Sequence, residues 1–103
     1  GDYEAAIRNV NTALQMKPND WRVYLERGIV YDVKKDYRKA IADYTRAIEL
    51  NASYANTYNN RGRAYRIIKN FPLSIADLTK AIELDPNNEE IYVNRAISYM
   101  VNG

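Results

Sequence analysis

The chain has 103 residues, 15 of them Lys or Arg and 13 Asp or Glu, which gives a net charge of +2. That charge is too small to predict binding to nucleic acid or to an anionic membrane. Cysteine and histidine are absent, which excludes disulfides, thiol and imidazole catalysis and most zinc sites, so we expect no cofactor and no metal. No apolar run approaches the roughly 18–20 residues of a transmembrane helix.

Three stretches share one helical pattern and follow each other at an interval of thirty-four residues. They are Asp2–Met16, Asp36–Leu50 and Asn70–Leu84. In the middle stretch apolar or small side chains recur at steps of three and four, which places them on one face of an α-helix that Asp36 is expected to cap. A fixed period in this range predicts an array of helical repeats rather than a domain with one central core.

Three more helices, of a second kind, are predicted between and after these stretches. They cover Trp21–Lys34, Ala55–Ile68 and Glu89–Asn102. In register they share an aromatic, an arginine, a small residue and a second aromatic. These are Tyr24, Tyr58 and Tyr92, then Arg27, Arg61 and Arg95, then Gly28, Gly62 and Ala96, then Tyr31, Tyr65 and Tyr99. A small residue lets a neighbouring helix approach closely, so we expect Gly28, Gly62 and Ala96 to be buried at helix–helix contacts.

Short turn segments separate these helices. Pro18 and Pro86 stop the helices before them, and Asn19, Ser53 and Asn87 are the expected caps of the helices that follow. Short connections favour antiparallel neighbours. The sequence therefore predicts an all-α chain of six antiparallel helices with no strand.

The pattern resembles the tetratricopeptide repeat (TPR), a helix–turn–helix unit of thirty-four residues. Its first helix carries an aromatic, a small residue and another aromatic, as Tyr24, Gly28 and Tyr31 do. Its second helix carries an aromatic, a small residue, a large apolar residue, an alanine and a closing proline. The copies here are Tyr3, Ala6, Val10, Ala13 and Pro18; Tyr37, Ala40, Tyr44, Ala47 and Ala52; and Phe71, Ser74, Leu78, Ala81 and Pro86.

The resemblance implies helix–turn–helix repeats stacked into a right-handed α-solenoid. Residues 1–18 would be the second helix of one repeat, residues 21–54 and 55–88 would be full repeats, and residues 89–103 would be the first helix of another. Since the chain starts and stops inside a repeat, we expect it to be a fragment of a longer protein.

One departure from the family recurs in every copy. Arg27, Arg61 and Arg95 stand where the family often has leucine, and Asp43 and Asp77 have the matching phase on the second helices. We predict that Arg27 pairs with Asp43 and Arg61 with Asp77. The alternative is that the aliphatic part of each arginine covers apolar surface while its guanidinium group reaches water.

No catalytic residues are indicated, and we predict that the protein is not an enzyme. Asp32, Asp36 and Asp43 are scattered through amphipathic helices, where a solvated face is the expected environment. The isolated glycines make no phosphate-binding loop. Nine of the ten tyrosines fall on packing positions of the repeat, which favours a core role over base stacking.

The resemblance implies a concave surface that is lined by the first helices and binds extended peptides. The residues expected there are Arg22, Leu25, Glu26 and Ile29, then Asn56, Asn59, Asn60, Arg63 and Arg66, then Glu90, Val93, Asn94 and Ile97. Asparagine amides both donate to and accept from a peptide backbone, and arginines hold carboxylates or phosphates. The alternative for the asparagines is that they are simply solvated.

One specialised ligand can be tested against the residues. TPR domains that grip the acidic C-termini of heat-shock chaperones use a clamp of lysines, asparagines and an arginine. Asn60 matches one asparagine of that clamp, but Leu25 and Ile29 replace the first lysine–asparagine pair, and Glu90 and Asn94 replace the later lysine and arginine. We therefore do not expect this clamp.

The predicted function is a non-enzymatic scaffold that binds a peptide or protein segment in its concave groove, with no nucleic acid and no membrane as partner. The alternative is a structural module that self-associates head to tail, since Gly1 and Gly103 have the same phase in the repeat. Tyr92, Ala96 and Tyr99 of one molecule would then meet Tyr3, Ala6 and Val10 of the next. RNA binding is a weaker third option, because the related RNA-binding repeats are usually one residue longer and more basic.

Overall fold

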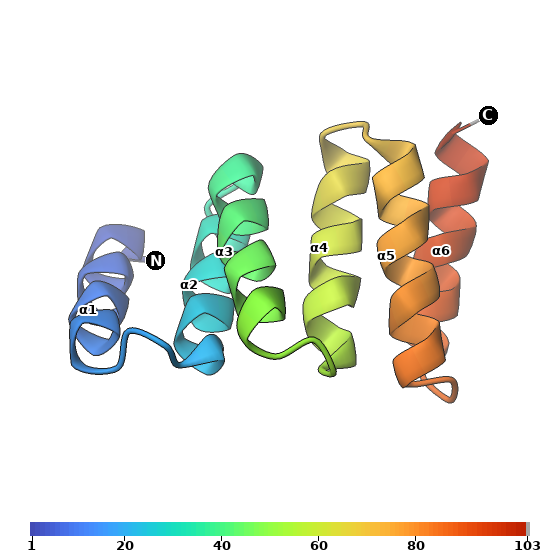
Figure 1. Ribbon diagram of the computed structural model, residues 1–103. Coiled ribbons are helices and arrows are strands. Elements are labelled where there is room, and N and C mark those ends of the chain that lie inside the picture. The colour runs from blue at the N-terminus through green and yellow to red at the C-terminus, as the bar shows by residue number, and fades with distance from the viewer. Residues whose placement is uncertain (103) are drawn as a thin grey trace. The chain divides into compact units, whose positions relative to one another are not determined.

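The computed structural model describes residues 1–102, and within them the chain forms six α-helices and no strand (Figure 1). They are α1 (Tyr3–Met16), α2 (Trp21–Val33), α3 (Tyr37–Leu50), α4 (Ala55–Ile67), α5 (Phe71–Leu84) and α6 (Glu89–Asn102). The all-α prediction is confirmed. The helices fall into two compact units, the first made of Gly1–Ala52 and the second starting at Ser53. Gly103, which was expected to have the same position in the repeat as Gly1, lies outside the described residues.

In the first unit α2 packs between α1 and α3, and successive helices run antiparallel (Figure 1). Ala40, Tyr44 and Ala47 of α3 are fully buried. A Cβ atom added to Gly28 of α2 would lie 2.6 Å from Tyr44 Cε1, closer than atoms can pack. Gly28 is therefore buried as predicted, and its lack of a side chain makes room for the Tyr44 ring.

In the second unit α5 packs against α4 and α6, and α6 also contacts α4. Leu78 of α5 is fully buried and occupies the position that Tyr44 has in the first unit. A Cβ atom on Gly62 of α4 would lie 2.8 Å from Leu78 Cγ and 3.1 Å from the backbone oxygen of Ser74. The prediction for Gly62 is therefore confirmed, by the same close approach of a first helix to a second.

The prediction for Ala96 is wrong, because Ala96 is exposed. Tyr92 and Tyr99 on the same face of α6 are exposed too, at 43% and 54%, although they occupy packing positions of the repeat. No helix in the described part of the chain covers this face, whereas the matching faces of α2 and α4 are covered by α3 and α5. The pattern identified an apolar face correctly but not whether a helix covers it.

Two carboxylates that were expected on solvated faces are buried. Asp32 accepts a hydrogen bond of 2.8 Å from the hydroxyl of Tyr44, and Asp43 is paired with Arg27. Asp36 is half-buried. The solvated-face expectation is therefore wrong for Asp32 and Asp43, because both carboxylates have polar partners on the neighbouring helix of the repeat.

The helix caps lie one residue later than predicted. Asp20 caps α2 by accepting from the backbone N–H of Arg22, and Asn88 accepts from that of Glu90 at the start of α6. The cap position of α4 is Tyr54, which makes no side-chain cap bond. Asp36 does precede α3 but also makes no such bond. Asn19, Ser53 and Asn87 are thus not the caps.

Candidate functional site

Paired arginines and aspartates join the two helices of each complete helix–turn–helix unit. Arg27 donates from Nε and Nη2 to the two carboxylate oxygens of Asp43, at 2.8 and 2.7 Å. Arg61 donates in the same way to Asp77, with both distances 2.8 Å. Hydrogen bonds to Asp43 raise the pKa of Arg27 above its ordinary value. Burial alone would lower the pKa of Arg61, but the hydrogen bonds and charge of Asp77 outweigh it and raise that pKa. Both predicted pairs are confirmed.

The same arginines reach backward to the second helix of the preceding repeat, which the sequence analysis missed. Arg27 Nη1 donates to Asn11 of α1 at 2.9 Å, and Arg95 Nη1 donates to Thr79 of α5 at 3.3 Å. Asn11 and Thr79 hold the same position of the repeat, two residues after the aspartate position. The recurrence of a polar residue at this position was the sequence feature that could have predicted these hydrogen bonds. A guanidinium with five donors can thus hold helices of consecutive repeats together.

A hydrogen-bonded network connects the two first helices of the second unit. The Asn59 amide of α4 donates to Glu90 of α6 at 3.3 Å and accepts from the Asn94 amide at 3.0 Å. Arg66 Nη1 donates to the backbone oxygen of Asn94 at 2.9 Å and to the hydroxyl of Ser98 at 3.4 Å. These bonds fix the polar surface of α4 against α6.

The network continues into the core through two hydroxyl groups. Ser98 of α6 and Ser74 of α5 are fully buried and share a hydrogen bond of 2.8 Å between their hydroxyl oxygens. Ser74, at the position of the family's alanine, thus has a polar partner for its buried hydroxyl across the helix interface.

Arg66 is a partly buried cation whose bonding partners are neutral. Burial lowers the pKa of Arg66, and the positive charge of Arg63 one turn earlier lowers it further. In the described part of the chain its guanidinium is held by the backbone of Asn94 and by Ser98, with no carboxylate. A negatively charged ligand group at this place would relieve the cost of burying the charge.

The predicted contact residues divide into three groups by exposure. Arg22, Glu26, Asn56, Glu90 and Val93 are exposed; Ile29, Asn60, Arg63, Arg66 and Ile97 are half-buried; Leu25, Asn59 and Asn94 are buried. Leu25 therefore belongs to the core of its unit. The amide of Asn94 donates to Asn59, and the amide of Asn59 donates to Glu90. The structure brings Asn59, Arg66 and Asn94 together. Asn60, the next residue on α4, has a half-exposed side chain.

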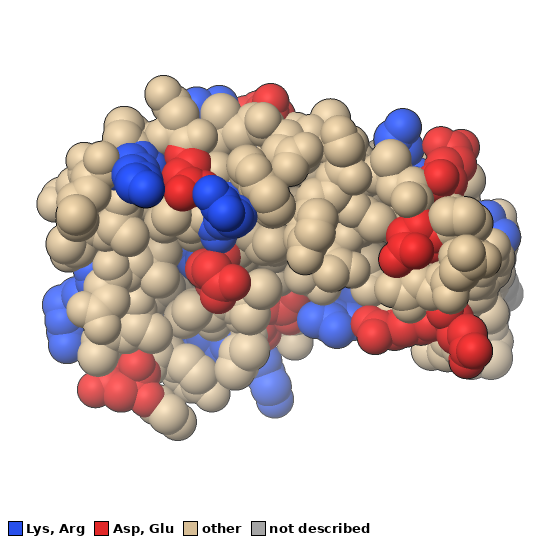
Figure 2. Space-filling view, turned by 90° about the horizontal axis from the view of Figure 1, so that it is seen from below, with Lys and Arg blue, Asp and Glu red and all other residues tan. Residues whose placement is uncertain are grey.

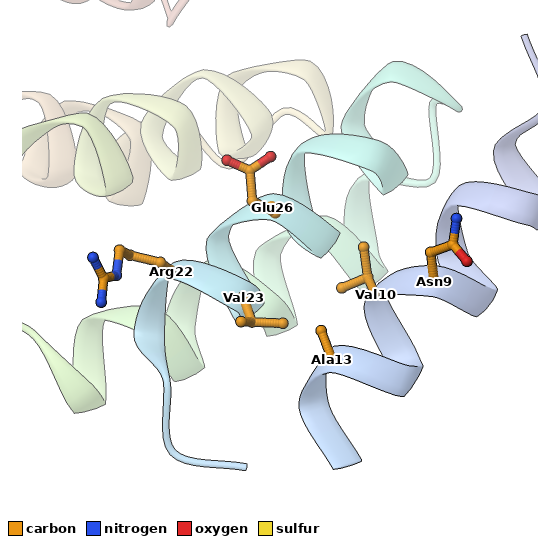
Figure 3. Close-up of a pocket in the computed structure, with 6 residues that line it drawn as sticks. All are labelled: Asn9, Val10, Ala13, Arg22, Val23 and Glu26. Carbon is orange, nitrogen blue, oxygen red and sulfur yellow. The ribbon is translucent and has the colours of Figure 1, made fainter. Parts of the chain in front are cut away.

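The first unit has a cleft of about 280 Å³ between α1 and α2 (Figure 3). Val10 and Ala13 of α1 and Val23 of α2 point into the gap, while Arg22 and Glu26 extend away from it at the edge (Figure 3). Asn9 completes the lining. Arg22 and Glu26 were predicted as contact residues, but the apolar floor beside them was not.

Neither a metal site nor a membrane-spanning helix is present in the described residues. Residues 1–102 contain no group of three or more acidic, histidine or cysteine side chains that could hold a metal ion. None of the helices in this range is both long and apolar enough to cross a membrane.

Comparison with known proteins gives one family and many similar folds. The family model described as "Tetratricopeptide repeat" matches residues 21–54 and 55–88. No curated protein matches the chain. The first TPR of Spaghetti (RPAP3) bound to the HSP90 peptide SRMEEVD has a TM-score of 0.94 and 26% identity, over 98% of this chain and 80% of that one.

Two other solved structures have the same fold. MamA has a TM-score of 0.93 and 26% identity over 99% of this chain, which spans 61% of the MamA chain. The second TPR domain of human RPAP3, in complex with the HSP70 peptide SGPTIEEVD, has a TM-score of 0.90 and 23% identity, over 96% of this chain and 82% of that one. The expected helix–turn–helix repeat fold is confirmed.

Proposed function

Because this chain belongs to the tetratricopeptide repeat family, we propose that it is a non-enzymatic scaffold that binds an extended peptide or protein segment on the face of its first helices. The groove prediction and its contact residues remain part of this proposal. So do the division into residues 1–18, 21–54, 55–88 and 89–103 and the exclusion of nucleic acid and membrane partners.

The observation that carries the proposal is the network between α4 and α6. Asn59 donates to Glu90 and accepts from Asn94, so these side chains are held in place before any ligand arrives. Asn60 lies next to them on α4 and makes no hydrogen bond in the described part of the chain. A fixed polar surface with a free amide suits a peptide backbone, because little side-chain entropy is lost on binding.

We expect the ligand to place a carboxylate against Arg66, with Arg63 one turn away. Among the described residues, Arg66 bonds through only one of its terminal nitrogens, so the remaining donors of the guanidinium fork can face a carboxylate. The face of the molecule in Figure 2 intersperses acidic and basic side chains and has no continuous basic patch. The net charge of the chain is only +2, which favours a ligand with one or two charges over a polyanion.

The relative bound to an HSP90 peptide supports the class of ligand, a short extended peptide. This chain lacks the clamp of lysines, asparagines and an arginine described above for acidic chaperone peptides, and the HSP90 peptide, SRMEEVD, is such an acidic peptide. Leu25 is buried, Glu90 already accepts from Asn59, and Asn94 is buried beside it. We therefore propose a ligand that carries a carboxylate but is bound by Asn60, Arg63 and Arg66 and not by the residues of that clamp.

The test uses peptides selected from a phage-displayed random library, with affinity measured by isothermal titration calorimetry. Changing Asn60→Ala together with Arg63→Glu removes the free amide and reverses one charge beside Arg66. We expect affinity for a selected peptide to fall by about tenfold or more, which corresponds to the loss of a central contact. Converting the acidic residues of the peptide to amides should cause a similar loss.

The matched control is Arg38→Glu, the same charge reversal at an exposed residue of the second helix α3. It should leave the affinity unchanged. Amide shift changes in a nuclear magnetic resonance titration should concentrate on the first helices. Equal binding by the double variant, or shifts confined to α1, α3 and α5, would refute the proposed surface.

Self-association is the second candidate function, and the exposed apolar face of α6 favours it. Tyr92, Ala96 and Tyr99 lie on this face at positions that α2 and α4 use for packing. Exposed aromatic side chains at packing positions indicate a surface that a protein helix can cover.

A further inference from the structure

Each first helix carries an exposed, β-branched aliphatic residue in its last turn. Val33 of α2, Ile67 of α4 and Val101 of α6 hold the same position of the repeat, and they are 58%, 43% and 45% exposed. In its unit α2 has both α1 and α3 against it, and α4 has both α5 and α6. The exposure therefore belongs to this position of the repeat and does not arise from the ends of the chain.

Helix formation does not account for the choice of these residues. Straight-chain polar residues such as lysine and glutamate form helices better than valine and isoleucine do, and they are the usual residues at exposed positions. A single exposed aliphatic side chain is ordinary on a protein surface. The same choice in all three first helices indicates that this position makes an apolar contact with a partner.

In α4 the position continues the surface that we propose for peptide binding. Asn60, Arg63 and Ile67 follow one another at steps of three and four, so they form one stripe along the helix. Asn60 and Arg63 are half-buried, and Ile67 is the most exposed residue of the three. Ile67 therefore extends the peptide surface by one helical turn.

Helix α6 contributes aliphatic side chains to the same place. It runs parallel to α4, and Arg66 of α4 bonds to the backbone oxygen of Asn94 and to the hydroxyl of Ser98 (Figure 1). Ile97 and Val101 lie on the same face of α6 as these two partners, because all four residues are three or four apart. Ile97 is half-buried and Val101 exposed. The Arg66 guanidinium is thus held on a helix face that becomes aliphatic toward its end.

The two units differ in charge at this place. Asp32 of α2 holds the position of Arg66, and its carboxylate accepts a hydrogen bond from the Tyr44 hydroxyl. Ile29 holds the position of Arg63. The first unit therefore has a carboxylate where the second has a guanidinium, which assigns a negatively charged ligand group to the second unit.

We propose that the ligand is a peptide with a large apolar side chain one or two residues from its acidic group, and that Ile67, Ile97 and Val101 bind this apolar side chain. These three residues are called the aliphatic patch. The inference rests on the proposed function and deepens it, because it specifies which residue accompanies the carboxylate.

The spacing follows from the geometry of the two chains. One helical turn, about 5.4 Å, separates Arg63 from Ile67 along α4. An extended peptide advances about 3.3 Å per residue. One or two residues of the ligand therefore cover the distance between the cations and the aliphatic patch.

The two contacts should strengthen each other. An apolar side chain on the aliphatic patch would exclude water from the carboxylate that faces Arg66. Charges attract each other more strongly where water is excluded. Loss of the apolar contact should therefore also weaken the contribution of the carboxylate.

The first test is the sequence preference of peptides selected from a phage-displayed random library. For the original chain we expect leucine, isoleucine, methionine or phenylalanine one or two positions from an aspartate or glutamate. For the double variant Ile67→Gln with Val101→Gln, the acidic residue should still be selected and the apolar preference should be lost. Affinity of the double variant for a peptide selected on the original chain should fall by about tenfold.

The matched control is Leu73→Gln. Leu73 is 45% exposed, as Ile67 and Val101 are, and it belongs to the same unit, but it lies on the second helix α5. The affinity of this variant should equal that of the original chain. Thermal unfolding followed by circular dichroism checks that all variants are folded.

The second test combines changes in the protein with a change in the peptide. Replacing the apolar residue of a selected peptide by serine should lower its affinity about tenfold for the original chain and less than about twofold for the double variant. The peptides have an amidated C-terminus, so that only side-chain carboxylates contribute. Tighter binding of the same peptides with a free C-terminus would assign the carboxylate to the chain end.

The outcomes separate this inference from the proposed function. Selected peptides that share an acidic residue but have no apolar residue near it would overturn the inference and leave the proposed function intact. Equal losses from the serine peptide on both chains would overturn it as well, because the apolar contact would then lie elsewhere. If no peptide were selected, or if the selected peptides had no acidic residue, the carboxylate contact of the proposed function would itself be refuted.

Discussion

Replacing Asp77 by alanine is expected to destabilise the second unit by about 3 kcal/mol, because it leaves the Arg61 guanidinium in the helix interface without its carboxylate. The two side chains are 9% and 17% exposed, and two hydrogen bonds of 2.8 Å join them. A charge in this position has lost most of its hydration, and the two hydrogen bonds to Asp77 compensate for much of that loss. Urea unfolding followed by circular dichroism measures the change.

The double variant Arg61→Met with Asp77→Leu should lose much less stability than Asp77→Ala alone, since no unpaired charge remains. Arg95→Met is the internal control. Arg95 has the same position in its repeat but bonds only to Thr79 within the described residues, so its removal should change the free energy of unfolding little. If the single and double variants at Arg61 and Asp77 lost equal stability, the charge argument would fail.

The recurrence of arginine and aspartate was enough to predict Arg27 with Asp43 and Arg61 with Asp77. A charged residue that recurs on an otherwise apolar helix face needs a partner of opposite charge. The order of helices in the repeat predicts which helix carries that partner. The backward bonds to Asn11 and Thr79 were missed because a neutral polar residue on a half-exposed helix is equally compatible with solvent.

Helix type and order followed from periodicity, and the helix ends were close to those predicted. The caps were displaced because several cap-forming residues stand in a row, as in Asn19–Asp20 and Asn87–Asn88, and composition does not distinguish between them. The exposure of Ala96 could not be predicted from its own helix. A pattern tells which face of a helix is apolar, whereas burial depends on the element that lies against it.

The sequence predicted which helix faces form the candidate site, but not which residues on those faces are exposed to a ligand. Asn59 and Asn60 are adjacent asparagines, yet the first is buried in a bond to Asn94 and the second is half-exposed. Which one faces a ligand depends on how α4 is rotated against α6. Arg66 was predicted as a surface cation, and its bonds to α6 arise from the same rotation.

Replacing Gly62 by leucine is expected to destabilise the second unit by about 1–3 kcal/mol, through overpacking against α5. Even the first carbon of the new side chain would lie 2.8 Å from Leu78 Cγ and 3.1 Å from the backbone oxygen of Ser74. Leu78 is fully buried and has little room to move away. The backbone oxygen cannot change rotamer at all, so α4 must shift away from α5. Thermal and urea unfolding report the loss.

The matched control is Ala96→Leu, a larger residue at the equivalent position of α6. Ala96 is exposed, and leucine is at least as good a helix former as the residues around it, so stability in dilute solution should change by less than about 0.5 kcal/mol. The contrast between the two variants isolates the approach of the second helix from the helix propensity of the new residue. Unchanged stability of Gly62→Leu, or equal losses in both variants, would show that the close approach of α5 is not what requires glycine at this position.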